Sequence, residues 1–477
     1  MDAKQICQVE PMLAEYLDRF ADCFERRDTR AHFPVYVRGQ LSELPRKSVE
    51  PIALAAGTPV RTLQEFLTHL TWSEDRMRQE VATIVAEEHA CEESVGIIDE
   101  TGWVKKGDRT PGVQRQYCGS VGKQENSIVT VHLGYAAGDF HCLLDGDLFL
   151  PESWDQDRDR CRRAGIPDEV VYRPKTEIAL ELYDRAVAHG VRFAWLTFDE
   201  WYGSKPPFLR ALQARGQKFV GEIPRNFRAW IDPPPQVTQR PFHRQGRGRG
   251  RKIPRLVAGS AEAQTVEHLA KSHPALAAQA WQTWRIKDTQ KGPLVWHVKH
   301  VLIHIKDEQG LPEGPYHLLV CTHPLTGEVK YFLSNAPADT PVKTLLRVAF
   351  GRWRIERCFE DGKGEVGLDH WEGRRWLGLK RHLILTTVSY LFLAKTCQRL
   401  RKKKPGVDRL PGPHGDRRLD HQLAARTRGT RAPVRARRPP HQVLPTTQRP
   451  GARLPPKNHH QKTATHWNQT LQAPSLR

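Results

Sequence analysis

Apolar residues in the first 90 positions recur every three or four residues, a spacing that predicts helices. One set comprises Met12, Leu13, Tyr16, Leu17, Phe20 and Phe24, and a second comprises Leu63, Phe66, Leu67, Leu70 and Trp72. The stretch between the two sets is more polar and includes the basic run Pro45-Arg46-Lys47. We therefore expect residues 1–90 to form a small helical module with basic loops.

Residues 91–224 alternate between strand-like and helix-like patterns. Strands are predicted where β-branched and aromatic residues gather, over residues 94–100, 113–118, 127–136, 191–199 and 219–224. Helices are predicted over residues 178–189 and 207–215. Strands followed by helix, strand and helix are typical of an α/β layer structure. Within this part, Asp145-Gly146-Asp147 is predicted to form a turn.

The pattern changes again after residue 224. Residues 225–340 contain a Pro-rich and an Arg/Gly-rich segment, then predicted strands over 294–305, 316–321 and 329–333. The last two are joined by Pro324-Leu325-Thr326-Gly327, which predicts a hairpin. Helical patterns return over 341–365 and 377–393. The expected fold is an α/β core, residues 91–224 and 341–400, interrupted by a β-rich insertion over 225–340.

The positive charge lies mainly at one end of the chain. The formal net charge is +20, and residues 401–477 contain 18 Lys or Arg and 3 Asp. A basic protein favours a polyanionic partner such as nucleic acid, although this tail alone accounts for most of the charge. Residues 401–477 also contain 11 Pro and no Glu, Ile or Phe. They are expected to be a disordered basic tail, or the product of out-of-frame translation.

Several classes of protein are disfavoured by what the sequence lacks. None of the nine cysteines has CxxC spacing, which argues against a zinc ribbon and fits a reducing cytoplasm. No apolar run is long enough to span a membrane, and no GxxxxGK[ST] motif for a nucleotide cofactor occurs. Two interpretations of the helical module, residues 1–90, remain open. It is either a DNA-binding unit or a subdomain that only packs on the core.

Two aspartates follow apolar, strand-like runs. Asp99 comes after Val95-Gly96-Ile97-Ile98, and Asp199 comes after Phe193-Ala194-Trp195-Leu196-Thr197-Phe198. A carboxylate at a strand end is fixed by the strand while it faces a cleft. Their neighbours Glu100 and Glu200 are less suited, because the next residue along a strand points to the opposite face. The alternative for each aspartate alone is an ordinary surface carboxylate.

A third acid lies in a helix-like stretch. Glu356 follows Arg352 by four residues and precedes Lys363 by seven, so the three side chains share one helix face. Arg352 and Lys363 are suited to hold phosphates beside a carboxylate-bound metal. Trp353 and Phe359 lie beside this face and can pack it onto the sheet. The alternative is a solvated salt bridge between Arg352 and Glu356.

Together, Asp99, Asp199 and Glu356 predict a site for a pair of hard divalent cations. Two such ions about 3.5–4 Å apart support in-line phosphoryl transfer, and they activate the nucleophile without a side-chain base. Few protein ligands, all of them oxygen, indicate Mg²⁺, with Mn²⁺ as the usual substitute.

At this point the chain resembles a known family, the DDE transposases of bacterial insertion sequences, in the branch with a β-rich insertion before the catalytic Glu. The resemblance covers roughly residues 15–395 and lies in four segments: 97–103 with Asp99, 198–203 with Asp199, 331–337, and 352–369 with Glu356. It implies a ribonuclease-H-like catalytic core and a signature of Arg, Glu and Lys at fixed spacing, which Arg352, Glu356 and Lys363 match. The Tyr that the family has three positions before this Arg is Ala349 here, and Trp353 is a candidate to compensate for it in binding a terminal phosphate.

The resemblance implies a DNA transposase. The expected reaction is cleavage of phosphodiester bonds at the ends of an insertion sequence, followed by transfer of the 3′-OH ends to target DNA. The expected setting is a homodimer on double-stranded DNA, in the bacterial cytoplasm at the nucleoid. The alternative is a catalytically inactive, truncated or frameshifted transposase derivative that binds DNA without cutting it.

Overall fold

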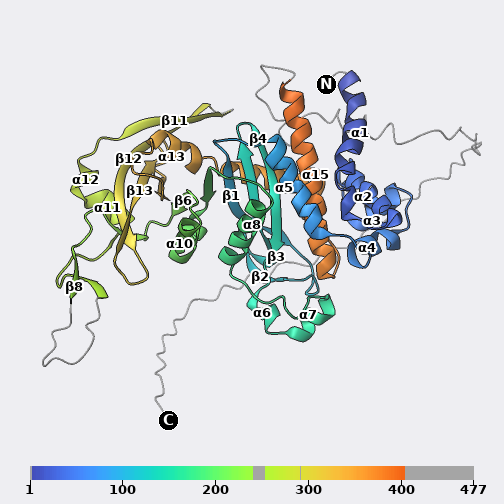
Figure 1. Cartoon of the computed structure of the whole chain (residues 1–477), viewed down its shortest axis with the longest axis horizontal. Coiled ribbons are helices and arrows are strands. Elements are labelled where there is room, and N and C mark those ends of the chain that lie inside the picture. The colour runs from blue at the N-terminus through green and yellow to red at the C-terminus, as the bar shows by residue number, and fades with distance from the viewer. Residues whose placement is uncertain (1–2, 240–252, 290–291, 403–477) are drawn as a thin grey trace, which may run out of the picture. The chain divides into compact units, whose positions relative to one another are not determined.

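The computed structural model describes residues 3–239, 253–289 and 292–402 (Figure 1). Every element described before residue 89 is helical, as the apolar spacing predicts. These elements are α1 (Ala3–Asp18), the short 3₁₀ turn η1 (Ala21–Cys23), α2 (Arg27–Gln40), α3 (Val49–Ala55), α4 (Val60–Thr68) and α5 (Glu74–Glu88). The predicted basic tail and the Arg/Gly-rich segment 246–252 lie outside the described residues, apart from residues 401 and 402.

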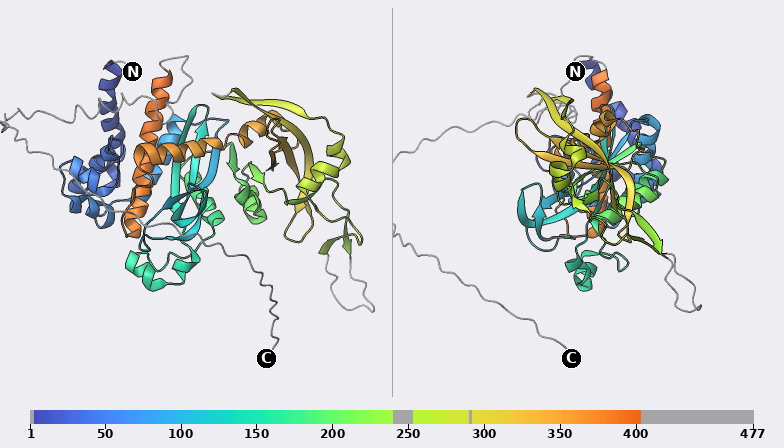
Figure 2. Two further views of the ribbon diagram at one scale, coloured as in Figure 1. Left: turned by 180° about the vertical axis from the view of Figure 1, so that it is seen from behind. Right: turned by 90° about the vertical axis from the view of Figure 1, so that its left-hand side faces the viewer.

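The N-terminal helices pack against the last described helix, α15 (Trp376–Lys402), which runs beside them in both views of Figure 2. The Tyr16 hydroxyl donates to the backbone carbonyl of Val388 at 2.8 Å. The Tyr36 hydroxyl lies 2.9 Å from Nδ1 of His382. These buried contacts join segments more than 300 residues apart, so the helical module and the C-terminal helix share one core.

The first sheet has five strands: β1 (Val95–Val104), β2 (Gln114–Cys118), β3 (Lys123–Ala137), β4 (Phe140–Leu148) and β5 (Trp195–Phe198). β3 pairs antiparallel with β1, β2 and β4, whereas β1 pairs parallel with β5. A parallel bridge between Leu196 and Phe219 extends the pairing beyond β5. The sheet confirms the mixed α/β class.

The prediction of a turn at residues 145–147 is wrong, because Asp145 and Asp147 lie in strand β4. The Asp145 carboxylate accepts a hydrogen bond from Arg185 Nε at 2.7 Å and lies 3.4 Å from Arg78 Nε. Asp147 lies 3.3 Å from Arg173. Arginines from α5, α8 and the loop before α8 pair with these carboxylates, which is why charged residues can occupy a buried strand.

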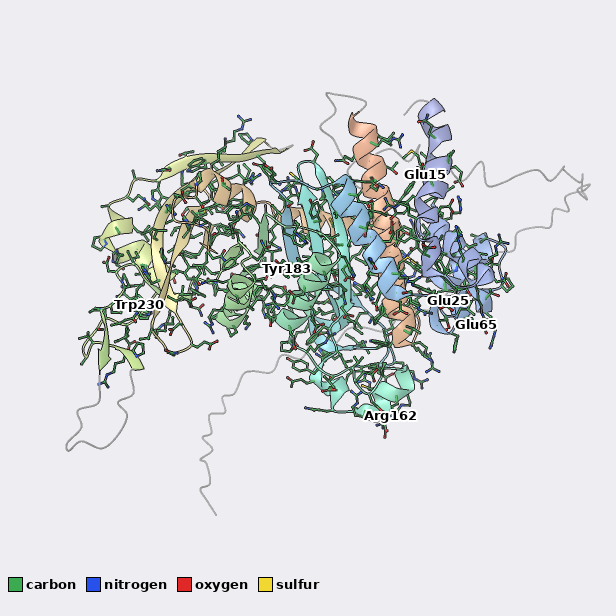
Figure 3. All side chains as sticks on the ribbon, viewed as in Figure 1. Glu15, Glu25, Glu65, Arg162, Tyr183 and Trp230 are labelled. Carbon is green, nitrogen blue, oxygen red and sulfur yellow. The ribbon has the colours of Figure 1, made fainter. Side chains whose placement is uncertain are left out.

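Helix α8 (Lys175–Ala188) packs on β3 and β4, and α5, α14 and α15 also contact β4. Figure 3 shows side chains filling the space around α8, where Tyr183 is labelled. Its hydroxyl donates to the Gln217 side chain at 3.0 Å. This contact anchors α8 to the loop before β6 (Val220–Ile223).

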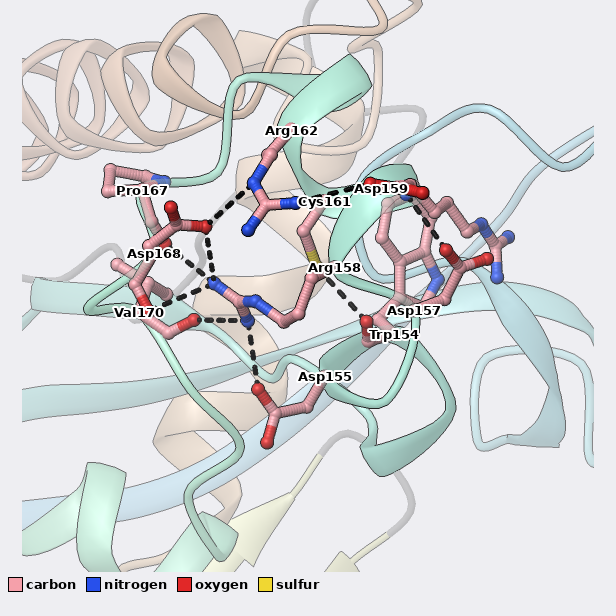
Figure 4. Close-up of polar contacts among 11 residues, drawn as sticks. Trp154, Asp155, Asp157, Arg158, Asp159, Cys161, Arg162, Pro167, Asp168 and Val170 are labelled. Atoms are coloured by element: carbon pink, nitrogen blue, oxygen red, sulfur yellow. Dashed lines mark hydrogen bonds and ion pairs between the residues drawn. The ribbon is translucent and has the colours of Figure 1, made fainter.

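Two short helices, α6 (Glu152–Asp155) and α7 (Arg158–Ala164), connect β4 to α8. Figure 4 shows Arg158 at the centre of this connection. Its guanidinium donates to the Asp155 carboxylate at 2.9 Å and to the backbone carbonyls of Pro167, Asp168 and Val170 at 3.0–3.1 Å. The partly buried guanidinium of Arg158 therefore closes the loop after α7 with several hydrogen bonds.

The second sheet has seven antiparallel strands in the order β10-β7-β12-β13-β14-β6, with β11 also paired to β12. Its remaining strands are β7 (Arg228–Trp230), β10 (Gln264–Thr265), β11 (Gln282–Thr289), β12 (Gly292–Lys306), β13 (Pro312–Thr322) and β14 (Val329–Ser334). A separate ladder joins β8 (Gln236–Gln239) to β9 (Ile253–Leu256), and α11 (Val266–Ser272) and α12 (Pro274–Ala277) lie between β10 and β11. The predicted β-rich character and the hairpin between β13 and β14 are confirmed.

The strand after Phe219 belongs to the second sheet and not to the first, because β6 pairs with β14. Phe219 itself bridges to Leu196 on β5. The chain therefore passes directly from one sheet to the other next to the end of β5. Two short helices, α9 (Glu200–Gly203) and α10 (Pro206–Ala214), connect β5 to this crossing point.

The predicted helix over residues 341–365 is two helices, α13 (Val342–Ala349) and α14 (Trp353–Val366). The break lies at residues 350–352, where Gly351 is followed by Arg352 at the N-terminus of α14. No helix in the described part of the chain is both long and apolar enough to cross a bilayer.

Candidate active site

Asp99 lies in the middle of β1 and not at its end, so the predicted position of Asp99 at a strand tip is wrong. β1 continues to Val104 because Thr101 to Val104 pair with the long strand β3. On its other edge, β1 has a partner only as far as Ile98, which lies opposite Phe198, the last residue of β5. Asp99 is therefore the first residue of β1 that lies beyond the end of β5.

Asp199 follows β5 directly, as the sequence predicts. It caps α9, and its carboxylate accepts a hydrogen bond from the backbone N–H of Tyr202 at 3.2 Å. Ile98 and Phe198 are paired on the parallel strands β1 and β5, and Asp99 and Asp199 are the residues that follow them. The two aspartates are therefore adjacent in space. Neighbouring strands are spaced about 4.8 Å apart, so the two carboxylates are close enough to interact.

Arg352 joins the sheet to α14. Its Nη1 donates to Asp99 Oδ2 at 2.6 Å, and its Nη2 donates to Glu356 Oε1 at 2.7 Å. The negative charge of Asp199 also acts on this guanidinium. Arg352 therefore contacts Asp99 and Glu356 directly, whereas Asp199 acts on it through its charge. The Arg352–Glu356 salt bridge that the sequence offered as an alternative is present, but it extends to a buried carboxylate on the sheet.

The carboxylates differ in environment. Asp99 is 8% exposed, whereas the Glu356 side chain is 59% exposed. Burial raises the pKa of Asp99 to about 7, while Arg352 acts to lower it and Asp199 to raise it further. Desolvation therefore outweighs the bound guanidinium, and a second nearby cation would be needed to keep Asp99 fully ionised at neutral pH.

The chemistry of these side chains suits a hard divalent cation, because all three offer carboxylate oxygens. Asp99 lies on β1, Asp199 follows β5, and Glu356 lies on α14. Among the described residues, no three His, Cys, Asp or Glu side chains are already clustered as metal ligands. The guanidinium of Arg352 lies between Asp99 and Glu356 and keeps their oxygens apart. Glu356 is the more exposed of the two carboxylates that Arg352 contacts, and its side chain faces solvent.

The other predicted residues lie along the same helix. Lys363 donates to the backbone carbonyl of Gly102 on β1 at 3.2 Å, and burial lowers its pKa. Trp353 is 36% exposed, and Lys287 Nζ lies 3.7 Å from the centroid of its ring. Sequence patterns did not single out Lys287, and its only local signal is a cation in a β-rich stretch.

Glu100, the neighbour of Asp99, is directed to a different partner. Its Oε1 accepts a hydrogen bond from Lys175 Nζ at 2.6 Å. Burial raises the pKa of Glu100, and Lys175 acts to lower it. This ion pair is consistent with the alternation argument, which assigned the metal-facing role to Asp99.

Residues 19–293 match the DDE superfamily endonucleases, and because this is more than half of the chain, the protein belongs to that family. Endonucleases of this superfamily generally use divalent metal ions.

The chain is also similar to a described relative. The chain is 30% identical over 192 residues to a protein from Microchaete diplosiphon described as "Probable transposase for insertion sequence element IS701". The similar region covers 39% of this chain and 47% of the relative, so the chain spans about half the length of the relative that it matches.

Proposed function

We propose that the protein is a DNA transposase that cleaves phosphodiester bonds at the ends of an insertion sequence and transfers the 3′-OH ends to target DNA. The observation that carries this proposal is the Arg352 fork, which ties Asp99 on the sheet to Glu356 on α14 beside Asp199. The family match ends at residue 293, so the role of Glu356 rests on this geometry.

The strand order supports a ribonuclease-H-like core. Three strands in antiparallel succession (β4, β3, β1) are followed by the parallel strand β5 and by the parallel bridge to Phe219. In this proposal, residues 91–224 and 341–400 form the catalytic core, 225–340 form the insertion, and 1–90 form a DNA-binding module. A homodimer would hold both ends of the element, acting at the nucleoid in the cytoplasm.

The roles of the side chains follow from their positions. Asp99, Asp199 and Glu356 would hold two Mg²⁺ ions, or Mn²⁺ as a substitute. When bound, such ions activate the attacking hydroxyl and stabilise the leaving oxygen. Arg352 would exchange its hydrogen bonds to the carboxylates for hydrogen bonds to a phosphate. Its planar guanidinium matches the spacing of phosphate oxygens as well as that of carboxylate oxygens. Lys363 and Trp353 would contact the same DNA strand.

The proposal is tested with a labelled duplex that carries the terminal sequence of the element, incubated with Mg²⁺ or Mn²⁺. The expected result is cleavage by the parent protein, no cleavage by Asp99→Asn or Glu356→Gln, and unchanged binding by both variants. Joined products with a second duplex would establish strand transfer. Binding without cleavage by the parent protein would refute the proposal in favour of a passive DNA-binding derivative.

A further inference from the structure

One residue of the second sheet lies directly beside the candidate active site. Lys287, on β11, has its Nζ 3.7 Å from the centroid of the Trp353 ring. Trp353 is the first residue of α14, three residues before Glu356. A contact this close between an ammonium and an indole face is a cation–π interaction. It connects the β-rich segment to the helix that carries the acid.

The direction of the Lys287 side chain depends on an irregularity in its strand. Arg285 pairs with Val295, but Lys287 pairs with Leu294, so Ile286 is an extra residue in the ladder. In a regular strand, residues 285 and 287 would point to the same face. Their partners 294 and 295 point to opposite faces, so the bulge turns Lys287 to the opposite face from Arg285. Bulges often re-aim a side chain next to an active site.

Lys287 lies near both a cation and an anion. The charges of Arg354 and Glu356 both act on it, and Arg354 Cζ lies 5.8 Å from the centroid of the same indole ring. Glu356 is already hydrogen-bonded to Arg352. Among the described side chains, no carboxylate forms an ion pair with Lys287, and its close contact is the Trp353 ring. The half-buried ammonium is thus positioned to bind an anion that enters the site.

We propose that Lys287 binds a backbone phosphate of the DNA end, so that the second sheet contributes directly to the active site. This inference rests on the proposed function, because it takes DNA as the ligand at Glu356. The phosphate would pair with the Lys287 ammonium while that ammonium stays against the Trp353 ring. Charge-assisted hydrogen bonds of this kind are about twice as strong as neutral ones and depend on position.

The test compares Lys287→Gln with Lys271→Gln, a matched control on α11. Lys271 is also a lysine of the second-sheet segment, but its side chain is 71% exposed and forms a 2.7 Å ion pair with Glu267. Binding of the terminal duplex is measured in chelator at fixed salt, with thermal unfolding to verify folding. Lys287→Gln should weaken binding about tenfold, Lys271→Gln at most about twofold, and Lys287→Arg should retain most of the affinity.

A second measurement locates the phosphate. Single methylphosphonates, which lack the charge of one phosphate, are placed in turn along the terminal nucleotides. At one position the neutral linkage should weaken binding by the parent protein and have no further effect on Lys287→Gln, as expected for two groups that interact directly. Equal losses for Lys287→Gln and Lys271→Gln, or additive losses at every position, would overturn the inference.

Failure of this inference is distinguishable from failure of the proposed function. A parent protein that binds ends with the predicted Lys287 dependence but never cleaves would overturn only the catalytic proposal. A parent protein that cleaves, with a Lys287→Gln variant that binds like the Lys271→Gln control, would overturn only the inference about Lys287.

Discussion

Replacing Asp99 by asparagine should make the protein more stable at alkaline pH while abolishing its proposed chemistry. Asp99 is 8% exposed, and burial raises its pKa to about 7 from an ordinary value of 3.8. The folded protein therefore holds a proton on Asp99 over a pH range in which the unfolded chain has released it. Asparagine has nearly the same shape and carries no charge, so it removes this titration.

The sign and size of the effect follow from the two pKa values. The stabilisation is fully present below the unfolded pKa near 4 and is lost as the pH rises through the folded pKa near 7. At 1.36 kcal/mol per pKa unit, the parent protein should lose about 2 to 3 kcal/mol between about pH 5 and about pH 8 from this group alone. The Asp99→Asn variant should not lose it, so its advantage should grow with pH.

Urea or thermal unfolding of both proteins at pH 5 and pH 8, in chelator, measures this difference. Asp159→Asn is a suitable control, because the Asp159 side chain is 80% exposed and forms a salt bridge with Arg162 only three residues away. The control should follow the parent protein at both pH values. If Asp99→Asn also lost stability in parallel with the parent protein, the claim that burial governs Asp99 would be refuted.

Three further predictions test other parts of the structure. Arg352→Lys should reduce cleavage at least about tenfold with a smaller change in DNA binding, because a single ammonium cannot make the two separate contacts of the guanidinium. Cleavage at the parent rate would contradict this. Asp145→Asn should destabilise the protein by about 3 kcal/mol, measured by thermal unfolding, because Arg78 has a 6% exposed side chain and loses a buried carboxylate. Gly221→Ala should cost about 2 kcal/mol, since the new Cβ would lie 1.9 Å from the Phe198 ring; an unchanged melting temperature would exclude this clash.

Local patterns were sufficient to predict most helices and strands. The predicted strand over 294–305 corresponds to β12, Gly292–Lys306, and the helix predicted over 178–189 corresponds to α8, Lys175–Ala188. The position of Asp199 after a strand is predicted correctly, because the apolar run that forms β5 ends at Phe198 and Asp199 then caps the next helix. Such features depend on neighbours in the sequence and can be found there.

Features that depend on distant partners were not predicted. The sequence Asp145-Gly146-Asp147 predicts a turn because it is typical of loops. In the structure it lies in β4, and the arginines that pair with the two aspartates come from α5, α8 and the loop before α8. The predicted strand over residues 94–100 is shorter than β1, because Asp99 and Glu100 resemble the end of a strand. Pairing with β3 extends the strand, and no pattern within β1 reveals that pairing.

The contacts of Arg352 link the cost of burying Asp99 to the proposed role of Asp99 as a metal ligand. Burial disfavours the ionised form of Asp99, and one guanidinium shared with Glu356 only partly offsets that cost. Any phosphate that takes the guanidinium away leaves Asp99 and Glu356 without their cation, which favours either a proton or a metal ion in its place. In the proposed reaction, DNA and metal are therefore expected to bind with positive coupling, because the phosphate removes the group that separates the carboxylates. The coupling should be weaker in Arg352→Lys, whose single ammonium cannot span Asp99 and Glu356; metal titrations with and without DNA would measure it, and equal coupling in both proteins would refute this account.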